Sequence, residues 1–176
     1  MKQLIFVVET TKTIQSDDRY IRKLINFRYD ISNNETKIQF VHMEGKSKYN
    51  DKSVIFKINK LKNTNKGGEN YIIYCFDTDQ IDCNQDDITM FNNEKDYCKK
   101  NNYLLIWFNS DIEFVLLGKS VESNEKKQES IRFFNKKEIN VSTLKLQKDN
   151  ENFKGHSNIF LILDNLLLIK KEAQYA

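Results

Sequence analysis

The amino-acid sequence predicts an α/β fold in which a mostly parallel sheet carries helices on both faces. Three segments of strand length are apolar throughout, which is typical of strands covered on both sides. They are QLIFVV at 3–8, YIIYCF at 71–76 and YLLIWF at 103–108, and TKIQFVHM at 36–43 adds a strand with partial alternation. Segments with helical spacing separate these strands, which indicates a parallel sheet built from strand–helix–strand units.

The intervening segments are expected to form helices. The first begins at Ser16 or Asp17, since either residue suits an N-cap. Further helices are expected over 52–62, 86–100, a short stretch closing at Gly118, 128–136, and 157–171 with Ser157 as its N-cap. Residues 44–51 are expected to form a turn and 119–129 an exposed loop. The 176 residues show no linker or repeat, so we expect one domain, with a core over about 1–118 and a helical extension over about 119–176.

Composition excludes some classes of function and leaves others open. The net charge is +3, from 28 basic and 25 acidic residues, and this balance neither indicates nor excludes nucleic-acid binding. Cys75, Cys83 and Cys98 lack the CxxC spacing of a zinc site and are too few for a disulfide framework, which fits a reducing cytoplasm. No apolar run is long enough to cross a bilayer, so no membrane partner is expected.

Polar and acidic residues follow three of the predicted strands. Glu9 follows the first, Asp77 and Asp79 follow the third, and Asn109 with Glu113 follows the fourth. Ligands of open parallel sheets bind beyond the carboxyl ends of the strands. Clustered carboxylates repel one another, and a hard divalent cation such as Mg²⁺ or Mn²⁺ supplies the missing positive charge. The pattern therefore predicts a metal site at Glu9, Asp77 and Asp79, with both aspartates pointing to one side of an extended segment.

The same residues also have a purely structural interpretation. Aspartate at a strand end often serves as a turn or cap residue, and an Asp-x-Asp pair arises readily by chance. His42 is expected to be a core or edge residue, and His156 to lie at a helix entry. The paired lysines Lys46/Lys48 and Lys126/Lys127 are expected on solvated faces, although a subset could track a phosphate backbone.

Three segments resemble proteins of the Toprim fold. VVETTKTIQSDDRYIRKLI resembles the opening strand, glutamate and helix of that family, and YIIYCFDTDQID resembles its strand with Asp-x-Asp. WFNSDIEFVLLG is the most specific piece, because it is similar to the Asn-x-x-x-Glu-Phe segment of the RloB-like branch, to which AriB-like proteins are related. The segments occur in the family's order and cover roughly residues 1–118.

The resemblance implies a divalent-metal-dependent nuclease acting on RNA, such as tRNA, or on DNA, as an effector in anti-phage defence. Carried over, Glu9 is the catalytic acid or a metal-linked group, and Asp77 and Asp79 coordinate Mg²⁺. Asn109 and Glu113 complete or brace the site.

Two positions depart from the family pattern. Thr10 stands where a glycine is usual, and Thr78 stands where a basic residue is frequent. A literal Glu44-Gly45-Lys46 occurs later, after the second strand, and is expected to be a turn.

Two other functions stay open. The first is a catalytically weak or inactive Toprim-fold subunit that docks to a partner such as a defence ATPase. The second is a receiver-like domain using acids for Mg²⁺ and phosphate, although no nucleophilic aspartate and lysine can be assigned to it. The partner and the oligomeric state, including a homodimer, are not determined by the sequence.

Overall fold

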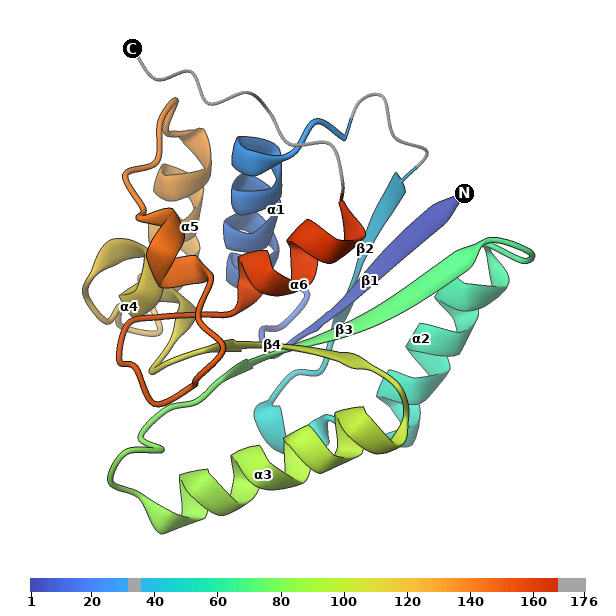
Figure 1. Ribbon diagram of the computed structural model, residues 1–176, viewed down its shortest axis with the longest axis horizontal. Helices are drawn as coiled ribbons and strands as arrows, with labels where there is room; N and C mark the ends of the chain where they lie inside the picture. Colours follow the sequence, from blue (N-terminus) through green and yellow to red (C-terminus); the bar gives the residue numbers. More distant parts are fainter. Residues whose placement is uncertain (32–35, 168–176) are drawn as a thin grey trace.

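Four parallel strands form one sheet in the order β2-β1-β3-β4 (Figure 1). The computed structural model describes residues 1–31 and 36–167. The strands are β1 (Lys2–Val8), β2 (Thr36–His42), β3 (Glu69–Asp77) and β4 (Leu104–Phe108). In the pairing register Val7 lies opposite both Val41 of β2 and Tyr74 of β3. The prediction of an α/β fold with a parallel sheet is confirmed.

Helices cover both faces of this sheet, as predicted. They are α1 (Ser16–Arg28), α2 (Lys52–Asn63), α3 (Gln85–Lys100), α4 (Ile112–Leu117), α5 (Lys126–Asn135) and α6 (Ile159–Leu166), with the 3₁₀ turns η1 (Lys46–Lys48) and η2 (Thr143–Leu146). In Figure 1, α1, α4, α5 and α6 lie above the sheet, and α2 and α3 lie below it. No helix within the described ranges is long and apolar enough to cross a membrane.

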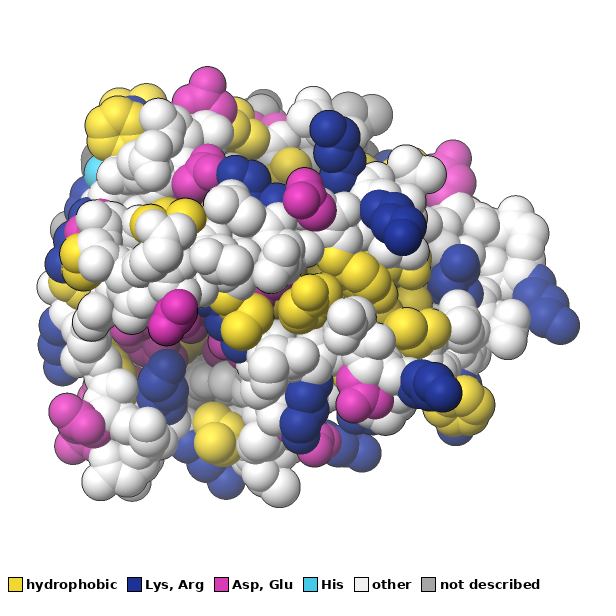
Figure 2. All heavy atoms as spheres, turned by 90° about the horizontal axis from the view of Figure 1, so that it is seen from below, with side chains coloured by type: hydrophobic (Ala, Val, Ile, Leu, Met, Phe, Trp, Pro, Cys, Tyr) yellow, Lys and Arg dark blue, Asp and Glu magenta, His cyan; other side chains and the backbone are white. Residues whose placement is uncertain are grey.

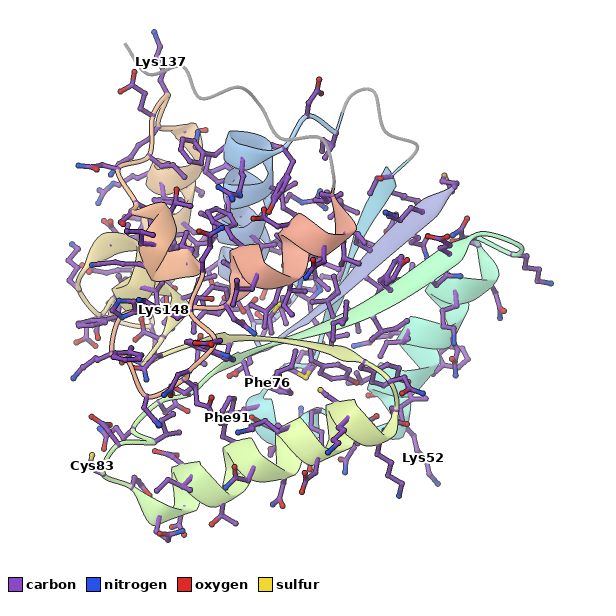
Figure 3. The ribbon with its side chains drawn as sticks, in the orientation of Figure 1. Lys52, Phe76, Cys83, Phe91, Lys137 and Lys148 are labelled. Atoms are coloured by element: carbon purple, nitrogen blue, oxygen red, sulfur yellow. The ribbon has the colours of Figure 1, made fainter. Side chains whose placement is uncertain are left out.

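The two layers of core result from alternation along the strands. Phe6 and Val8 point into the core beneath α1 and α6, whereas Ile5 and Val7 point into the core above α2 and α3. Figure 3 shows Phe76 of β3 and Phe91 of α3 in the second layer, between the sheet and the helix. Burial on both sides explains why the central strands are apolar throughout.

Local signals place most helix ends correctly. Gly118 ends α4 in the left-handed conformation, as predicted. Asp51, which was expected only to be part of a turn, caps α2 by accepting a hydrogen bond from the Ser53 amide. Two N-cap predictions are wrong. Gln15 precedes α1 in the left-handed conformation, so Ser16 is already helical. The last helix begins only at Ile159 with Asn158 at its N-cap, and the Ser157 hydroxyl, one residue earlier, donates to the Trp107 carbonyl and accepts from the Ile159 amide.

The boundaries of the C-terminal half differ from the sequence interpretation in two places. The expected loop over 119–129 is shorter, because α5 already begins at Lys126. The last helix ends at Leu166, and the part of the prediction that covers 168–171 lies outside the described residues. A loop between η2 and α6 joins the end of β4, where Ser157 bridges Phe108 in antiparallel fashion.

Candidate functional site

The strand order places the predicted acids at a topological switch point. The chain leaves β1 toward β2 through α1 on one face, and it leaves β3 toward β4 through α3 on the other face. The two connections diverge between the carboxyl ends of β1 and β3, and such a divergence leaves a crevice in open α/β sheets. Glu9 directly follows β1 and Asp77 ends β3, so both lie at this crevice.

Glu9 and Asp77 meet directly. The Glu9 Oε1 atom accepts a hydrogen bond of 2.9 Å from the Asp77 amide. Burial raises the pKa of Glu9 to about 8, although the Asp77 amide and the Lys46 ammonium oppose the rise. Burial also raises the pKa of Asp77 well above its ordinary value, and the negative charge of Glu9 adds to the effect. These are carboxylates without enough positive charge around them.

Asp79 does not lie beside Asp77 in the way that the sequence interpretation expected. The strand ends at Asp77, and Asp79 has a left-handed backbone with φ of 53°. Its amide bonds the Ser110 carbonyl at 2.9 Å, and buried Thr78 accepts a hydrogen bond from the Ser110 amide. The prediction of an extended Asp77–Asp79 segment is therefore wrong. The Asp79 side chain is half exposed, at the rim of the crevice.

Lys46 links the two aspartates. Its ammonium donates to the Asp77 carbonyl at 2.6 Å and to Asp79 Oδ2 at 3.1 Å. Burial lowers the Lys46 pKa, but the facing carboxylates of Glu94, Asp79 and Glu9 outweigh it and raise the pKa overall. The expectation that Lys46 lies on a solvated face is wrong, because the Glu44-Gly45-Lys46 turn delivers it to the site.

A second acid–lysine pair lies on the opposite side of the crevice. Glu113 of α4 is fully buried, and its Oε2 atom lies 3.1 Å from the Lys126 ammonium of α5. Burial raises the pKa of Glu113, and the charge of Asp17 contributes. Asp17 of α1 accepts a hydrogen bond from the Thr10 amide, and burial raises its pKa as well. Glu113 therefore acts on the site through its charge, which contributes to the raised pKa of Asp77.

Asn109 is not brought to the acids. Its side-chain amide donates to the Glu151 carbonyl, and its backbone amide bonds the His156 carbonyl at 2.9 Å. It fastens the C-terminal loop to the end of β4. Of the two histidines, His42 pairs with Asp18 at 3.0 Å and His156 donates to the Lys154 carbonyl at 2.8 Å. None of these contacts reaches Glu9 or Asp77.

Glu94 is a member of the site that the sequence interpretation missed. It lies on α3 with no exposed surface, and neither carboxylate oxygen has a hydrogen-bond partner among residues 1–31 and 36–167. Burial raises its pKa to about 8, with Lys46 opposing the rise and Glu9 and Asp79 adding to it. A signal was present, because Glu94 falls between Phe91 and Cys98 at helical spacing on the face expected to be core.

The surface around this cluster is hollowed. Seen from the side of α2 and α3, acidic side chains gather in a recess with basic side chains beside them (Figure 2). Next to the crevice an open hollow of about 470 Å³ is lined by Asp79, Gln80, Asn84, Asp87, Ser110, Asp111 and Ser120. Its lining is polar, so it suits a hydrated or phosphate-bearing ligand better than an apolar one.

The oxygen ligands that line the crevice are of the type that a hard divalent cation prefers. Carboxylates are its preferred ligands, and among the described residues both oxygen atoms of Glu94 and one of Glu113 are buried without a partner. In the described part of the chain, no three His, Cys, Asp or Glu side chains converge as a complete metal cage. Mg²⁺ does not require one, because it typically keeps several waters and takes one or two carboxylates. Asp77 and Asp79 would hold it, with Glu9 beside them.

Comparisons with protein families, with curated proteins and with solved structures give no relative of this chain. No protein-family model, no curated protein and no solved structure matches it. Its function therefore has to be inferred from the geometry of the crevice.

Proposed function

We propose that the crevice between the carboxyl ends of β1 and β3 binds Mg²⁺ or Mn²⁺ and hydrolyses phosphodiester bonds in RNA or DNA. The single observation that carries the proposal is the buried pair at the switch point, where the Glu9 carboxylate accepts a hydrogen bond from the backbone amide of Asp77 and burial raises the pKa of both carboxyl groups. Burial and mutual repulsion disfavour the charged forms of these two carboxyl groups, and a divalent cation that stabilises the charged forms would bind favourably at such a place.

Each residue of the crevice would have its own part in the chemistry. When bound, the cation supplies Lewis-acid stabilisation of a phosphoryl oxygen and lowers the pKa of water. Asp77 and Asp79 orient that ion. Glu9, whose carboxylate is bonded to the Asp77 amide beside that ion, would act as the general base that takes up a proton from the attacking water. Lys46 and Lys126 flank the acids on opposite sides and would attract the phosphate chain.

A direct test measures cleavage and metal binding on the same samples. Labelled single-stranded and duplex RNA and DNA, and tRNA, are incubated with the chain in Mn²⁺, Mg²⁺ or EDTA. Asp77→Asn keeps an oxygen that can accept the Ile112 amide hydrogen bond but removes the charge. We expect it to lose cleavage by on the order of 100-fold or more. Asp96→Asn, at an exposed position of α3, is the matched control and should keep full cleavage.

One observation favours a second candidate function, a docking subunit with weak or no chemistry. The Lys46 ammonium already compensates part of the acidic cluster, so the fold does not depend on an added metal ion for all of its charge balance. This alternative predicts no Mn²⁺ uptake and no cleavage of any of the substrates. For the proposed nuclease, undiminished cleavage by the Asp77→Asn chain would contradict the mechanism.

A further inference from the structure

The Lys46 ammonium occupies a position that a cation would take. Two oxygen atoms hold it, the Asp77 carbonyl at 2.6 Å and Asp79 Oδ2 at 3.1 Å. Around it lie the charges of Glu94, Asp79 and Glu9, and the Glu94 charge acts on it most strongly. A backbone carbonyl with carboxylates on several sides is the surrounding that hard metal ions find in proteins.

The backbone of the turn that carries Lys46 directs this side chain toward the crevice. Glu44 has φ of 63° and Gly45 has φ of 130°, so two consecutive residues have positive φ shortly after the end of β2. The Gly45 amide donates to the Glu9 carbonyl at 3.1 Å, which fastens the turn to the end of β1. The outward side chain of this turn, Glu44, pairs with Lys57 at 3.8 Å on the surface. The backbone therefore separates the two charges and directs Lys46 to the crevice.

Glu94 gives the independent observation. It is fully buried on α3, and within the part of the chain that the structure describes both of its oxygen atoms lack a hydrogen-bond partner. A buried carboxylate in this state is costly unless a cation compensates it. The positive charge that acts on Glu94 is that of Lys46, which lowers the Glu94 pKa through its charge alone. The space facing Glu94 thus has more acceptor atoms than the single ammonium uses.

We propose that the Lys46 ammonium takes the place of a metal ion between Glu94, Asp79 and the Asp77 carbonyl. Removing this ammonium would then create a site for one additional divalent ion. The inference deepens the proposed function and rests on it for the ion at Asp77 and Asp79. The unaltered site would therefore hold one divalent ion together with the Lys46 ammonium. The added ion enters from the side of Asp79, which is half exposed.

The test counts Mn²⁺ ions bound per chain, by calorimetric titration and by loss of the free Mn²⁺ signal in electron paramagnetic resonance. We expect Lys46→Ala to bind one more Mn²⁺ than the unaltered chain. Lys46→Arg keeps the positive charge and should match the unaltered chain. The double change Lys46→Ala with Glu94→Gln removes the wall carboxylate, and the additional ion should be lost or bound at least about tenfold more weakly.

Lys48→Ala is the matched control, because Lys48 lies on the same 3₁₀ turn but is exposed. If Lys46→Ala does not fold, Lys46→Gln removes the charge and keeps most of the length of the side chain. Thermal unfolding with and without Mn²⁺ checks the same point, since Mn²⁺ should raise the melting temperature of Lys46→Ala more than that of the unaltered chain.

The outcomes separate this inference from the proposed function. The number of ions on the unaltered chain tests the proposed function, and the difference between the two chains tests the inference. An equal number of ions on both chains overturns the role of Lys46 even if the unaltered chain binds one. An extra ion that persists unweakened when Glu94 is also replaced overturns the assignment of the position.

Discussion

Glu94→Gln should stabilise the protein, and its effect should grow with pH. The Glu94 carboxyl is buried without a hydrogen-bond partner, and its pKa is raised from 4.5 to about 8. Between these pH values the folded chain keeps the proton and the unfolded chain loses it. Since the unfolded state then binds fewer protons, the free energy of unfolding falls as pH rises through this window. Glutamine has nearly the same shape and does not titrate.

The magnitude comes from the same two pKa values. Each pH unit between 4.5 and about 8 costs about 1.4 kcal/mol, so the carboxyl costs about 3 kcal/mol at pH 7 and little at pH 5. For a domain of this size 1 kcal/mol corresponds to about 2–4 °C in melting temperature. We therefore expect Glu94→Gln to melt roughly 6–12 °C above the unaltered chain at pH 7, with near equality at pH 5.

The assay is urea denaturation followed by circular dichroism at pH 5, 6, 7 and 8, in EDTA so that no metal ion compensates the site. Glu122→Gln is the control, because Glu122 is exposed before α5 and should change nothing at any pH. A stability difference between Glu94→Gln and the unaltered chain that stays constant across the series would refute the reasoning. It would show that shape, and not the charge of Glu94, accounts for the effect.

Two further predictions concern the flanks of the crevice. Lys126→Met removes the ammonium that pairs with fully buried Glu113. It should lower the free energy of unfolding at neutral pH by about 2–3 kcal/mol. This is somewhat below the value for fully buried pairs, because part of Lys126 is exposed. Exposed Lys127→Met is its control in the same denaturation assay, and equal stability of the two variants would contradict the pairing. Gly45→Ala places a side chain at φ of 130°, which should cost about 1–3 kcal/mol; an unchanged melting temperature would mean that the turn relaxes without strain.

Much of the fold could be predicted from local patterns. Strands β1, β3 and β4 are continuous apolar runs because both of their faces are buried, and the helices between them have clear apolar periodicity. The acids at the carboxyl ends of β1 and β3 could be predicted to lie on one edge, since parallel strands end together. The Glu9–Asp77 contact agrees with that expectation.

Side-chain direction beyond the strand ends could not be predicted in this way. Asp79 and Ser110 have left-handed backbones, with φ of 53° and 75°, and no propensity of these residue types requires that. The consequence is that Asp79 turns toward Lys46. Asn109, which carried the most specific resemblance, bonds the loop at Glu151 and not the acids.

What the sequence by itself determined is the alternation of buried strands and helices and the acidic edge at Glu9 and Asp77, because burial and strand polarity depend directly on the order of residues. The partners of that edge were decided only by the tertiary structure. Lys46, Glu94 and Lys126 come from three separate elements, and their charges matter only at short distance in a poorly solvated crevice. Packing, and not local sequence, sets those distances.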